Sequence, residues 1–308
     1  MMEGDLGLWA IPLAILGGAI RVSTPFLFVS LGELLTERSG RINLGLEGTL
    51  VFGAMSGYAV AYLTGSAWTG VLAAAAAGSV FGLVHGVLCS LPRVNDIAIG
   101  IALMLLGMGL AFYFGKPFIQ PVAPDLPAIP LGWWAESPQV QASLRVNVLF
   151  LIGIVAAVAL WWMFRATRVG LLIRVVGDST DAARAMGLRP AVIRTLATAA
   201  GGAFAGVGGA YLSLFYPGSW NEGISSGQGL MAVALVIFAR WNPIACFWAA
   251  ILFGGAGALG PALQSVGVSE GYYLFYAAPY VLTLALLIAT SSPTRAMTGA
   301  PGELSITK

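Results

Sequence analysis

Carboxylates and amides beside long apolar stretches are the residues of this sequence best suited to chemistry. Asn43 and Glu47 stand four residues apart, which would place both on one face of a helix entering an apolar segment. A charged side chain at the centre of a membrane costs at least ~2.5 kcal/mol, so a carboxylate here is a candidate for contact with a polar solute. A structural tie from Glu47 to Arg38 or Arg41 is the alternative.

A second polar cluster opens another short apolar segment, residues 223–239. Polar residues followed directly by a short apolar segment are expected where an interrupted helix presents its free N-terminal amides to a polar ligand. A simple loop at the membrane surface is the alternative interpretation. The cluster consists of Trp220, Asn221, Glu222, Ser225, Ser226 and Gln228.

The stretch 178–190 predicts a short helix between two apolar segments. Asp178, Ser179 or Thr180 can cap its start, Gly187 can end it, and Pro190 prevents its continuation. Such a helix would fit a shallow groove on another protein, or it would lie on the membrane surface as an ordinary amphipathic helix. Its apolar patch consists of Ala182, Ala183 and Met186, with Asp181 and Arg184 among them.

Catalysis has little support in the sequence. Residues 223–227 read G-I-S-S-G and match the G-x-S-x-G nucleophile pattern, but that pattern requires a histidine within reach, and His85 is the only histidine. A membrane hydrolase built on Ser225 is therefore a minor alternative. Asp178 and Asp181 lack the further carboxylates of a Mg²⁺ site, and the sequence has no G-x-x-x-x-G-K-[ST] phosphate loop. We expect a non-catalytic chain that itself binds no metal or cofactor.

The elements that would position these residues are membrane-spanning helices. Of the 308 residues, 58% are hydrophobic and 9% are charged, which excludes a soluble protein. The net charge of +2 is too balanced for a nucleic-acid-binding surface. Because a spanning helix needs roughly 20 apolar residues, long gaps between charges mark the spans. Nine segments result: 6–32, two between Glu47 and Arg93 with a turn at 64–66, and 97–115, 147–164, 195–221, 223–239, 241–269 and 271–294.

The predicted fold is an all-α, polytopic transmembrane bundle of roughly eight to ten spans, with discontinuous helices among them. Residues 1–295 form the transmembrane domain and 296–308 a cytoplasmic tail. Residue 21 is an arginine inside the first apolar segment, so that segment is a long tilted helix, a helix with a snorkelling side chain, or a helix broken near 23–25.

Loop charges give the predicted bundle an orientation in a cell membrane. The loop 165–194 carries six arginines and two aspartates, so the positive-inside rule makes it cytoplasmic. The proline-rich connection 116–145 then lies outside the cell. Counting spans outward places further cations on the cytoplasmic side: Arg93, Arg240, Arg295 and Lys308.

Glycines recur at intervals of four inside the predicted spans. The positions are 53 and 57, then 78, 82 and 86, and finally 202 and 206. G-x-x-x-G spacing lets helix backbones approach closely. Packing within the chain and a dimer interface are both consistent with it.

Four stretches carry a family resemblance. They are residues 32–48, with E-R-S-G-R-I-N-L-G-L-E-G at 37–48, then V-N-D-I at 94–97, residues 176–187, and F-A-R-W-N-P at 238–243. In these places the chain resembles the permease subunits of ATP-binding-cassette importers for branched-chain amino acids, simple sugars and nucleosides. It is most similar to the nucleoside or simple-sugar subgroup. Met104 is a departure, because relatives often carry an asparagine there.

The resemblance implies an import permease that works in a larger complex. Two permease subunits, identical or different, form the pathway, and two cytoplasmic ATPase subunits bind ATP and Mg²⁺. An extracytoplasmic binding protein or lipoprotein delivers the solute. The resemblance also implies a coupling helix that docks on an ATPase subunit through Asp178, Asp181, Ala182, Ala183, Arg184, Met186 and Gly187.

A small polar solute is expected to move through this permease, since carboxylates and amides suit sugar hydroxyls or the edges of nucleoside bases. An ion-coupled secondary transporter that uses Glu47 or Asp96 as its proton site is the alternative. The predicted pathway residues are Asn43, Glu47, Asn95, Asp96, Trp220, Asn221, Glu222, Ser225, Ser226 and Gln228.

Overall fold

The computed structural model describes residues 10–131, 133–134, 141, 144–265, 275, 277–290 and 299–305. Helices dominate these residues, as the sequence predicts. The helices are α1 (Ala10–Arg38), α2 (Leu46–Thr64), α3 (Ala67–Leu88), α4 (Asp96–Gly115), α6 (Val148–Ala166), α7 (Arg168–Asp178), α8 (Thr180–Ala185), α9 (Pro190–Leu214), α10 (Gln228–Phe238), α11 (Pro243–Ser265), α13 (Ala278–Thr290) and α14 (Gly302–Ser305). A 3-10 turn, η2, covers Lys116–Phe118, and two short antiparallel strands are β1 (Ala128–Pro130) and β2 (Arg145–Asn147).

Six helices of the described residues are long and apolar enough to cross a membrane: α1, α3, α4, α6, α9 and α11. Each of the nine predicted segments contains a helix, and the first turn falls at Gly65–Ser66 as expected. α10 has 11 residues, about half of the roughly 20 that a span requires. α10 is therefore the interrupted helix that the sequence predicts.

The first span is one continuous helix. α1 has 29 residues and retains Pro25 in its interior, so the predicted alternative of a break near 23–25 is wrong. At ~1.5 Å per residue α1 is roughly 43 Å long, which exceeds the ~30 Å hydrocarbon core of a bilayer. A helix of this length carries its polar C-terminal turn beyond the apolar layer.

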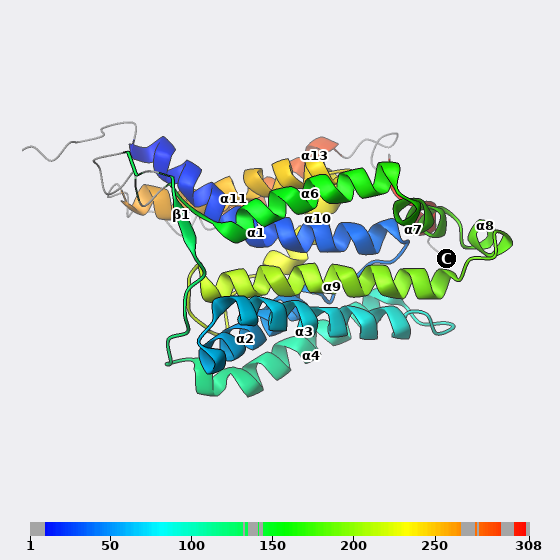
Figure 1. The fold of residues 1–308 in the computed structure, drawn as a ribbon. Helices are drawn as coiled ribbons and strands as arrows, with labels where there is room; N and C mark the ends of the chain where they lie inside the picture. The colour runs from blue at the N-terminus through cyan, green and yellow to red at the C-terminus, as the bar shows by residue number, and fades with distance from the viewer. Residues whose placement is uncertain are drawn as a thin grey trace, which may run out of the picture.

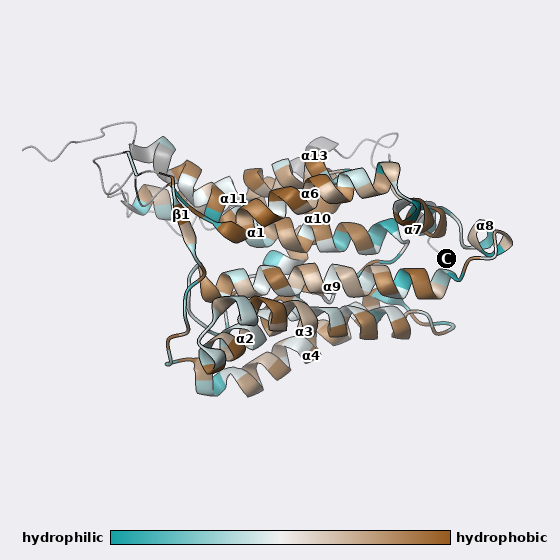
Figure 2. Cartoon of the chain, in the orientation of Figure 1, coloured by the Kyte–Doolittle hydropathy of each residue, from teal (hydrophilic) through white to brown (hydrophobic). Residues whose placement is uncertain are grey.

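The bundle has two different ends (Figure 1). α7 and α8 lie at one end, and β1 lies at the other. At the first end Arg38 donates to the carbonyl of Trp241 at 2.9 Å, and Arg41 pairs with Asp96 at 2.7 Å. We call it the basic end. Hydrophobic residues run along the long helices, and hydrophilic ones gather where α1 and α9 approach α7 (Figure 2).

The grouping of cations predicted from the sequence is confirmed where it can be compared. Arg93 and Arg240 stand in the connections before α4 and α11, at the same end as α7 and α8. Arg295 and Lys308 lie outside the described residues.

Glycine-mediated contacts hold the central helices together. α2 packs against α3, α4 and α9, and α3 packs along α9. A Cβ on Gly78 would lie 2.1 Å from the Gly202 carbonyl oxygen, and one on Gly82 would lie 2.2 Å from the Thr198 oxygen. The G-x-x-x-G pattern of α3 and α9 therefore serves packing within this chain, where small residues let two backbones touch.

Candidate functional site

The carboxylate of Glu47 closes the start of α10. Glu47 lies in the first turn of α2 and is buried. Its Oε1 accepts hydrogen bonds from Ser225 Oγ at 2.5 Å and from the Gly227 amide at 3.0 Å, and its Oε2 accepts one from the Gly229 amide at 2.6 Å. Negative charge is favourable there because free amides and the helix dipole attract it. The structure thus joins Glu47 to the 220–228 cluster.

The loop before α10 is shaped to direct its amides at Glu47. Ser226 and Gly227 both adopt positive φ angles, of 46° and 79°. Glycine accepts this conformation freely, whereas for serine it costs roughly 1–2 kcal/mol. Two amides at the start of α10 are already occupied by Glu47, so they are not open to a ligand in this conformation.

The proposed tie between Glu47 and an arginine is absent. Arg38 donates to the Trp241 carbonyl, and Arg41 pairs with Asp96. The three hydrogen bonds that the Glu47 carboxylate accepts in the described residues come from Ser225, Gly227 and Gly229, at the start of α10. The Glu47 carboxylate is therefore a connection between α2 and α10.

Asn43 does not share a helix face with Glu47, so that prediction is wrong. α2 begins at Leu46, and Asn43 lies in the preceding loop. The Asn43 Oδ1 accepts a hydrogen bond from the Gly45 amide at 2.9 Å, a local turn that competes with helix formation. The backbone N–H of Asn43 donates a hydrogen bond to Glu33 Oε1, also at 2.9 Å. Asn43 is buried and shapes the entry to α2.

Asn95 and Asp96 belong to the basic end. The Asn95 Oδ1 accepts hydrogen bonds from two amides of the first turn of α4, at 2.8 and 3.1 Å, and so caps that helix. Asp96 forms the ion pair with Arg41. In this conformation both residues have structural partners.

The start of α4 is also distant from the Glu47 junction. A Cβ on Gly48 would lie 2.4 Å from the Met104 carbonyl oxygen, so Met104 sits at the level of Glu47. Met104 follows Asp96 by eight residues, which is roughly 12 Å along a helix. The predicted pathway set therefore divides into two groups, and the backbone of Met104 lies beside the residue that follows Glu47.

The other members of the 220–228 cluster have different environments. Trp220 is 1% exposed and packs against Gly115 at the end of α4. Trp220 Nε1 and Gln228 Oε1 are both buried, and neither has a hydrogen-bond partner in the described residues. Asn221 and Glu222 are exposed, as is Ser226. The cluster is therefore partly loop surface and partly bundle interior.

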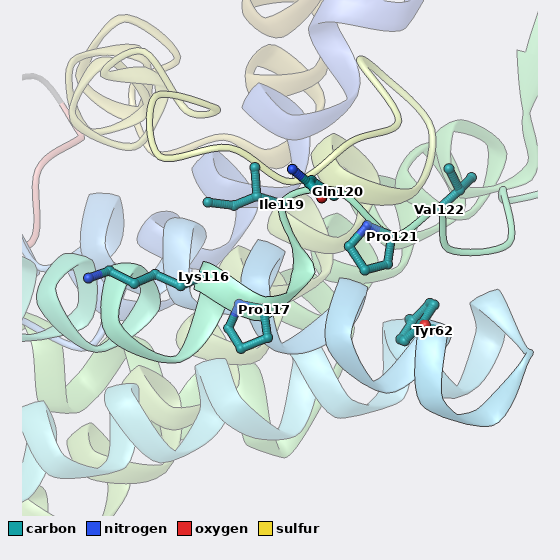
Figure 3. Close-up of a pocket in the computed structure, with 7 residues that line it drawn as sticks. All are labelled: Tyr62, Lys116, Pro117, Ile119, Gln120, Pro121 and Val122. Carbon is teal, nitrogen blue, oxygen red and sulfur yellow. The ribbon is translucent and has the colours of Figure 1, made fainter.

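A hollow of about 780 Å³ opens at the end opposite the basic end, beside the end of α2 (Figure 3). None of the predicted pathway residues lines it. The lining residues are Tyr62, Lys116, Pro117, Ile119, Gln120, Pro121 and Val122.

The predicted short helix is α8. The Ser179 hydroxyl oxygen accepts the Ala182 amide at 3.2 Å and caps its start. Gly187 ends it with a φ of 76°, and Pro190 is the first residue of α9. The short helix that the capping and termination signals predict is therefore confirmed.

One face of α8 is available to a partner and the other is not. Ala183 is fully buried, so the prediction that it faces another protein is wrong: a helix that lies against a bundle must bury one side. Met186 is 63% exposed. The Arg184–Asp181 pair at 3.5 Å is largely exposed and contributes little to stability. The exposed residues from the predicted set are Asp178, Asp181, Ala182, Arg184, Met186 and Gly187.

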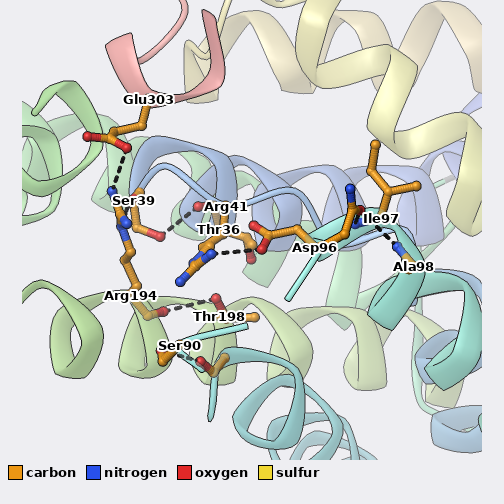
Figure 4. A network of polar contacts seen from close by, with 12 residues as sticks. Thr36, Ser39, Arg41, Ser90, Asp96, Ile97, Ala98, Arg194, Thr198 and Glu303 are labelled. Carbon is orange, nitrogen blue, oxygen red and sulfur yellow. Dashed lines mark hydrogen bonds and ion pairs between the residues drawn. The ribbon is translucent and has the colours of Figure 1, made fainter. Parts of the chain in front are cut away.

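Two functional candidates were not predicted from the sequence, and they meet beside α8 (Figure 4). Arg194 of α9 is buried and lies 3.5 Å from the Glu303 carboxylate of α14. Glu303 Oε1 accepts the Thr180 amide at 2.7 Å. Burial raises the pKa of the Glu303 carboxyl, but the hydrogen bonds from Thr180 and the charge of Arg194 outweigh this, so the pKa lies below its usual value. The signal in the sequence is P-G-E-L at 301–304, a proline and an acid that suit a helix start.

Two more buried carboxylates lie near the end of α1. Glu33 accepts the Asn43 amide, and Glu37 accepts the indole N–H of Trp241. Glu33 thereby holds the loop before α2 in place, and Glu37 holds the turn before α11. Their four-residue spacing, which places both on one helix face, is the signal in the sequence for this pair.

The arrangement around Ser225 does not support a nucleophile. Its hydroxyl donates to Glu47, while His85 lies in the last turn of α3, whose C-terminus is at the basic end. A serine nucleophile requires a base that accepts its proton and a histidine within reach. The membrane hydrolase is therefore not favoured.

Fold and site together define a membrane transport protein. Interrupted helices that meet inside an all-α membrane bundle are typical of this class. The chain belongs to the family described as branched-chain amino acid transport system / permease component, whose model matches residues 14–291. This confirms the family resemblance and the prediction of a transport permease, and it does not favour the ion-coupled alternative.

Named relatives extend over most of the chain. A putative glucose ABC transporter permease, TsgC13 of Haloferax volcanii, is 34% identical over 83% of this chain and 79% of its own. The guanosine ABC transporter permease NupQ of Bacillus subtilis is 30% identical over 86% of this chain and 88% of its own. The nucleoside ABC transporter permease NupC of Lactococcus lactis is 28% identical, with the same coverage.

Proposed function

We propose that this chain is the membrane-spanning subunit of an ATP-driven importer for a nucleoside or a simple sugar. The observation that carries the proposal is the match of named sugar and nucleoside permeases over more than four fifths of the chain. ATP and Mg²⁺ would bind on two partner ATPase subunits. A second permease subunit and an extracytoplasmic binding protein would complete the importer, which would lie in the cell membrane.

The solute would pass the junction of α2 and α10. Glu47 and Ser225 meet there, and Gln228 Oε1 is a buried acceptor that lacks a partner in the described residues. A buried polar atom without a hydrogen bond is unfavourable, so a hydroxyl or amino group of a solute would find a favourable contact there. When α10 shifts, the three hydrogen bonds to Glu47 would become available to the solute.

Uptake by the complete importer tests the solute. Cells that express the permease with its ATPase and binding protein should accumulate a radiolabelled nucleoside or hexose, and an inactive ATPase subunit should abolish this. Uptake that persists with the inactive ATPase and follows a pH gradient would support the ion-coupled transporter instead. Competition by unlabelled ribose, glucose, guanosine and adenosine would separate the two solute classes.

We further propose that α8 is the coupling helix and that the basic end faces the cytoplasm. Its exposed face offers Ala182 and Met186 for apolar contact and Asp181 and Arg184 for charge pairing. Nucleotide-dependent movement of the ATPase would shift the bundle only if the ATPase binds the two conformations unequally.

The coupling role can be tested with a charge reversal. Arg184→Glu should uncouple ATP hydrolysis from uptake, so that more ATP is hydrolysed per solute imported, while the permease still folds. Arg168→Gln, at an exposed cation on the first turn of α7, is the matched control and should behave as the wild type. Unchanged uptake in Arg184→Glu would contradict the coupling role.

A further inference from the structure

The segment 299–305 is fixed to the bundle on one side. Pro301 is buried, and Ala300 and Leu304 pack against the core cluster that includes Leu34 and Trp241. Segments that only follow a loop surface do not bury apolar side chains in this way. The segment therefore moves with the end of α1 and the turn before α11.

The other side of the segment 299–305 contacts the start of α8 and the end of α7. Glu303 Oε1 accepts the amide of Thr180, the first residue of α8. A Cβ on Gly302 would lie 2.4 Å from the Asp178 carbonyl oxygen, so the backbones of α14 and α7 touch. This contact requires a residue without a side chain at 302.

Arg194 completes the connection at the start of α9. Its Nε donates to the Ser39 carbonyl at 2.9 Å, which reaches the end of α1. One terminal nitrogen donates to the Val176 carbonyl at 3.0 Å and to the Thr180 hydroxyl at 2.9 Å, and lies 3.5 Å from Glu303. The guanidinium of Arg194 therefore links α9 to the loop after α1, to α7, to α8 and to α14. Figure 4 shows its contact with Glu303.

We propose that Glu303 is a positioning residue that ties the start of α8 to α1 and α9, so that a displacement of α8 by the ATPase is passed to the spanning helices. This inference rests on the proposed coupling role of α8. Without Glu303, the start of α8 would keep its two chain connections, the buried Ala183 and the hydrogen bond from Arg194 to the Thr180 hydroxyl, but it would lose its link to α14 and could tilt more freely relative to α1. Arg194 is buried and Glu303 is partly exposed, and the charge-assisted hydrogen bond from the Thr180 amide to the Glu303 carboxylate fixes the geometry of the contact.

The number of ATP molecules hydrolysed per solute imported, in the reconstituted complete importer, tests the tie. Two independent changes should raise that ratio: Glu303→Gln removes the charge, and Gly302→Val separates α14 from α7 sterically. Residues that couple two distant sites typically change coupling by roughly 2- to 30-fold. Glu303→Asp, which keeps the charge, should restore part of the wild-type ratio.

The outcomes separate a positioning role from a purely structural one. If Glu303 served stability alone, the variants would lower the amount of folded permease and leave the ratio per folded complex unchanged, which would overturn the proposal. If Arg184→Glu raises the ratio and both Glu303→Gln and Gly302→Val do not, the tie is wrong and the coupling role of α8 stands. If none of the three changes it, the coupling role itself fails.

Discussion

The Glu47 carboxylate and the Gly229 amide are 2.6 Å apart, although 182 residues separate them in the sequence. A Cβ on Gly229 would also lie 2.6 Å from the Glu47 Cα. The N-termini of α2 and α10 therefore meet inside the bundle. Two helix N-termini carry partial positive charge and would repel each other, and a carboxylate placed between them offsets both.

The first prediction concerns this carboxylate. Glu47→Gln leaves one acceptor oxygen where two receive three hydrogen bonds, so a buried amide loses its partner. An unsatisfied buried donor costs about 1–3 kcal/mol. We expect the thermal unfolding midpoint of the purified permease to fall and uptake to fall with it.

The Ser225→Ala variant removes one of the three hydrogen bonds and should therefore lower the free energy of unfolding by less, about 0.5–1.5 kcal/mol. Equal stability of Glu47→Gln and the wild type would contradict the structure at this junction.

The fold was largely predictable because its signals are local. Gaps between charges located a helix in each of the nine apolar segments, and α8 followed from Ser179, Gly187 and Pro190. These signals depend on desolvation cost and backbone geometry, which act over a few residues. The division of the pathway candidates was not predictable, because it depends on which helix ends meet. Only the fold shows that α10 begins beside Glu47 and that Asp96 pairs with Arg41.

Errors in the sequence reasoning have physical causes that single residues illustrate. The spacing of Asn43 and Glu47 predicts a shared helix face, but the Asn43 side chain accepts a hydrogen bond from the Gly45 amide and α2 begins only at Leu46. Ala183 was assigned to a partner, since a short helix alone does not reveal which face the bundle covers. Glu303 was missed because its partners, Thr180 and Arg194, are more than one hundred residues away.

The second prediction concerns the glycine contacts of α3 and α9. Gly82→Val would force a Cβ to within 2.2 Å of the Thr198 carbonyl oxygen, and such overpacking costs about 1–3 kcal/mol or more. Gly109→Val is the matched control, because no atom lies within 4 Å of its Cβ position. We expect Gly82→Val alone to lower the yield of folded, monodisperse chain in detergent. Similar yields for both variants would mean that α3 and α9 pack differently.

The third prediction concerns orientation. Met186 at the basic end is 63% exposed, and Trp133, in the connection that also contains β1, is 79% exposed. In whole cells a membrane-impermeant maleimide should label Trp133→Cys, and it should label Met186→Cys only after permeabilisation. Background should be low because Cys89 and Cys246 are both buried. The reverse labelling pattern would place the basic end outside the cell and refute the proposed coupling role.

The fourth prediction concerns the pH dependence of the α14 contact. The pKa of Glu303 lies below its usual value of 4.5 in the folded protein, so folding favours the carboxylate. The resulting stability is fully present above pH 4.5 and is lost as the pH falls through the lower folded pKa. We therefore expect a higher unfolding midpoint for the wild type than for Glu303→Gln at pH 7, a constant difference down to about pH 5, and a narrowing difference below it. The two proteins differ only at residue 303, so the difference between their unfolding midpoints isolates the Glu303 carboxyl. A difference that persists unchanged at the lowest pH would show that the glutamate acts through its shape and not its charge.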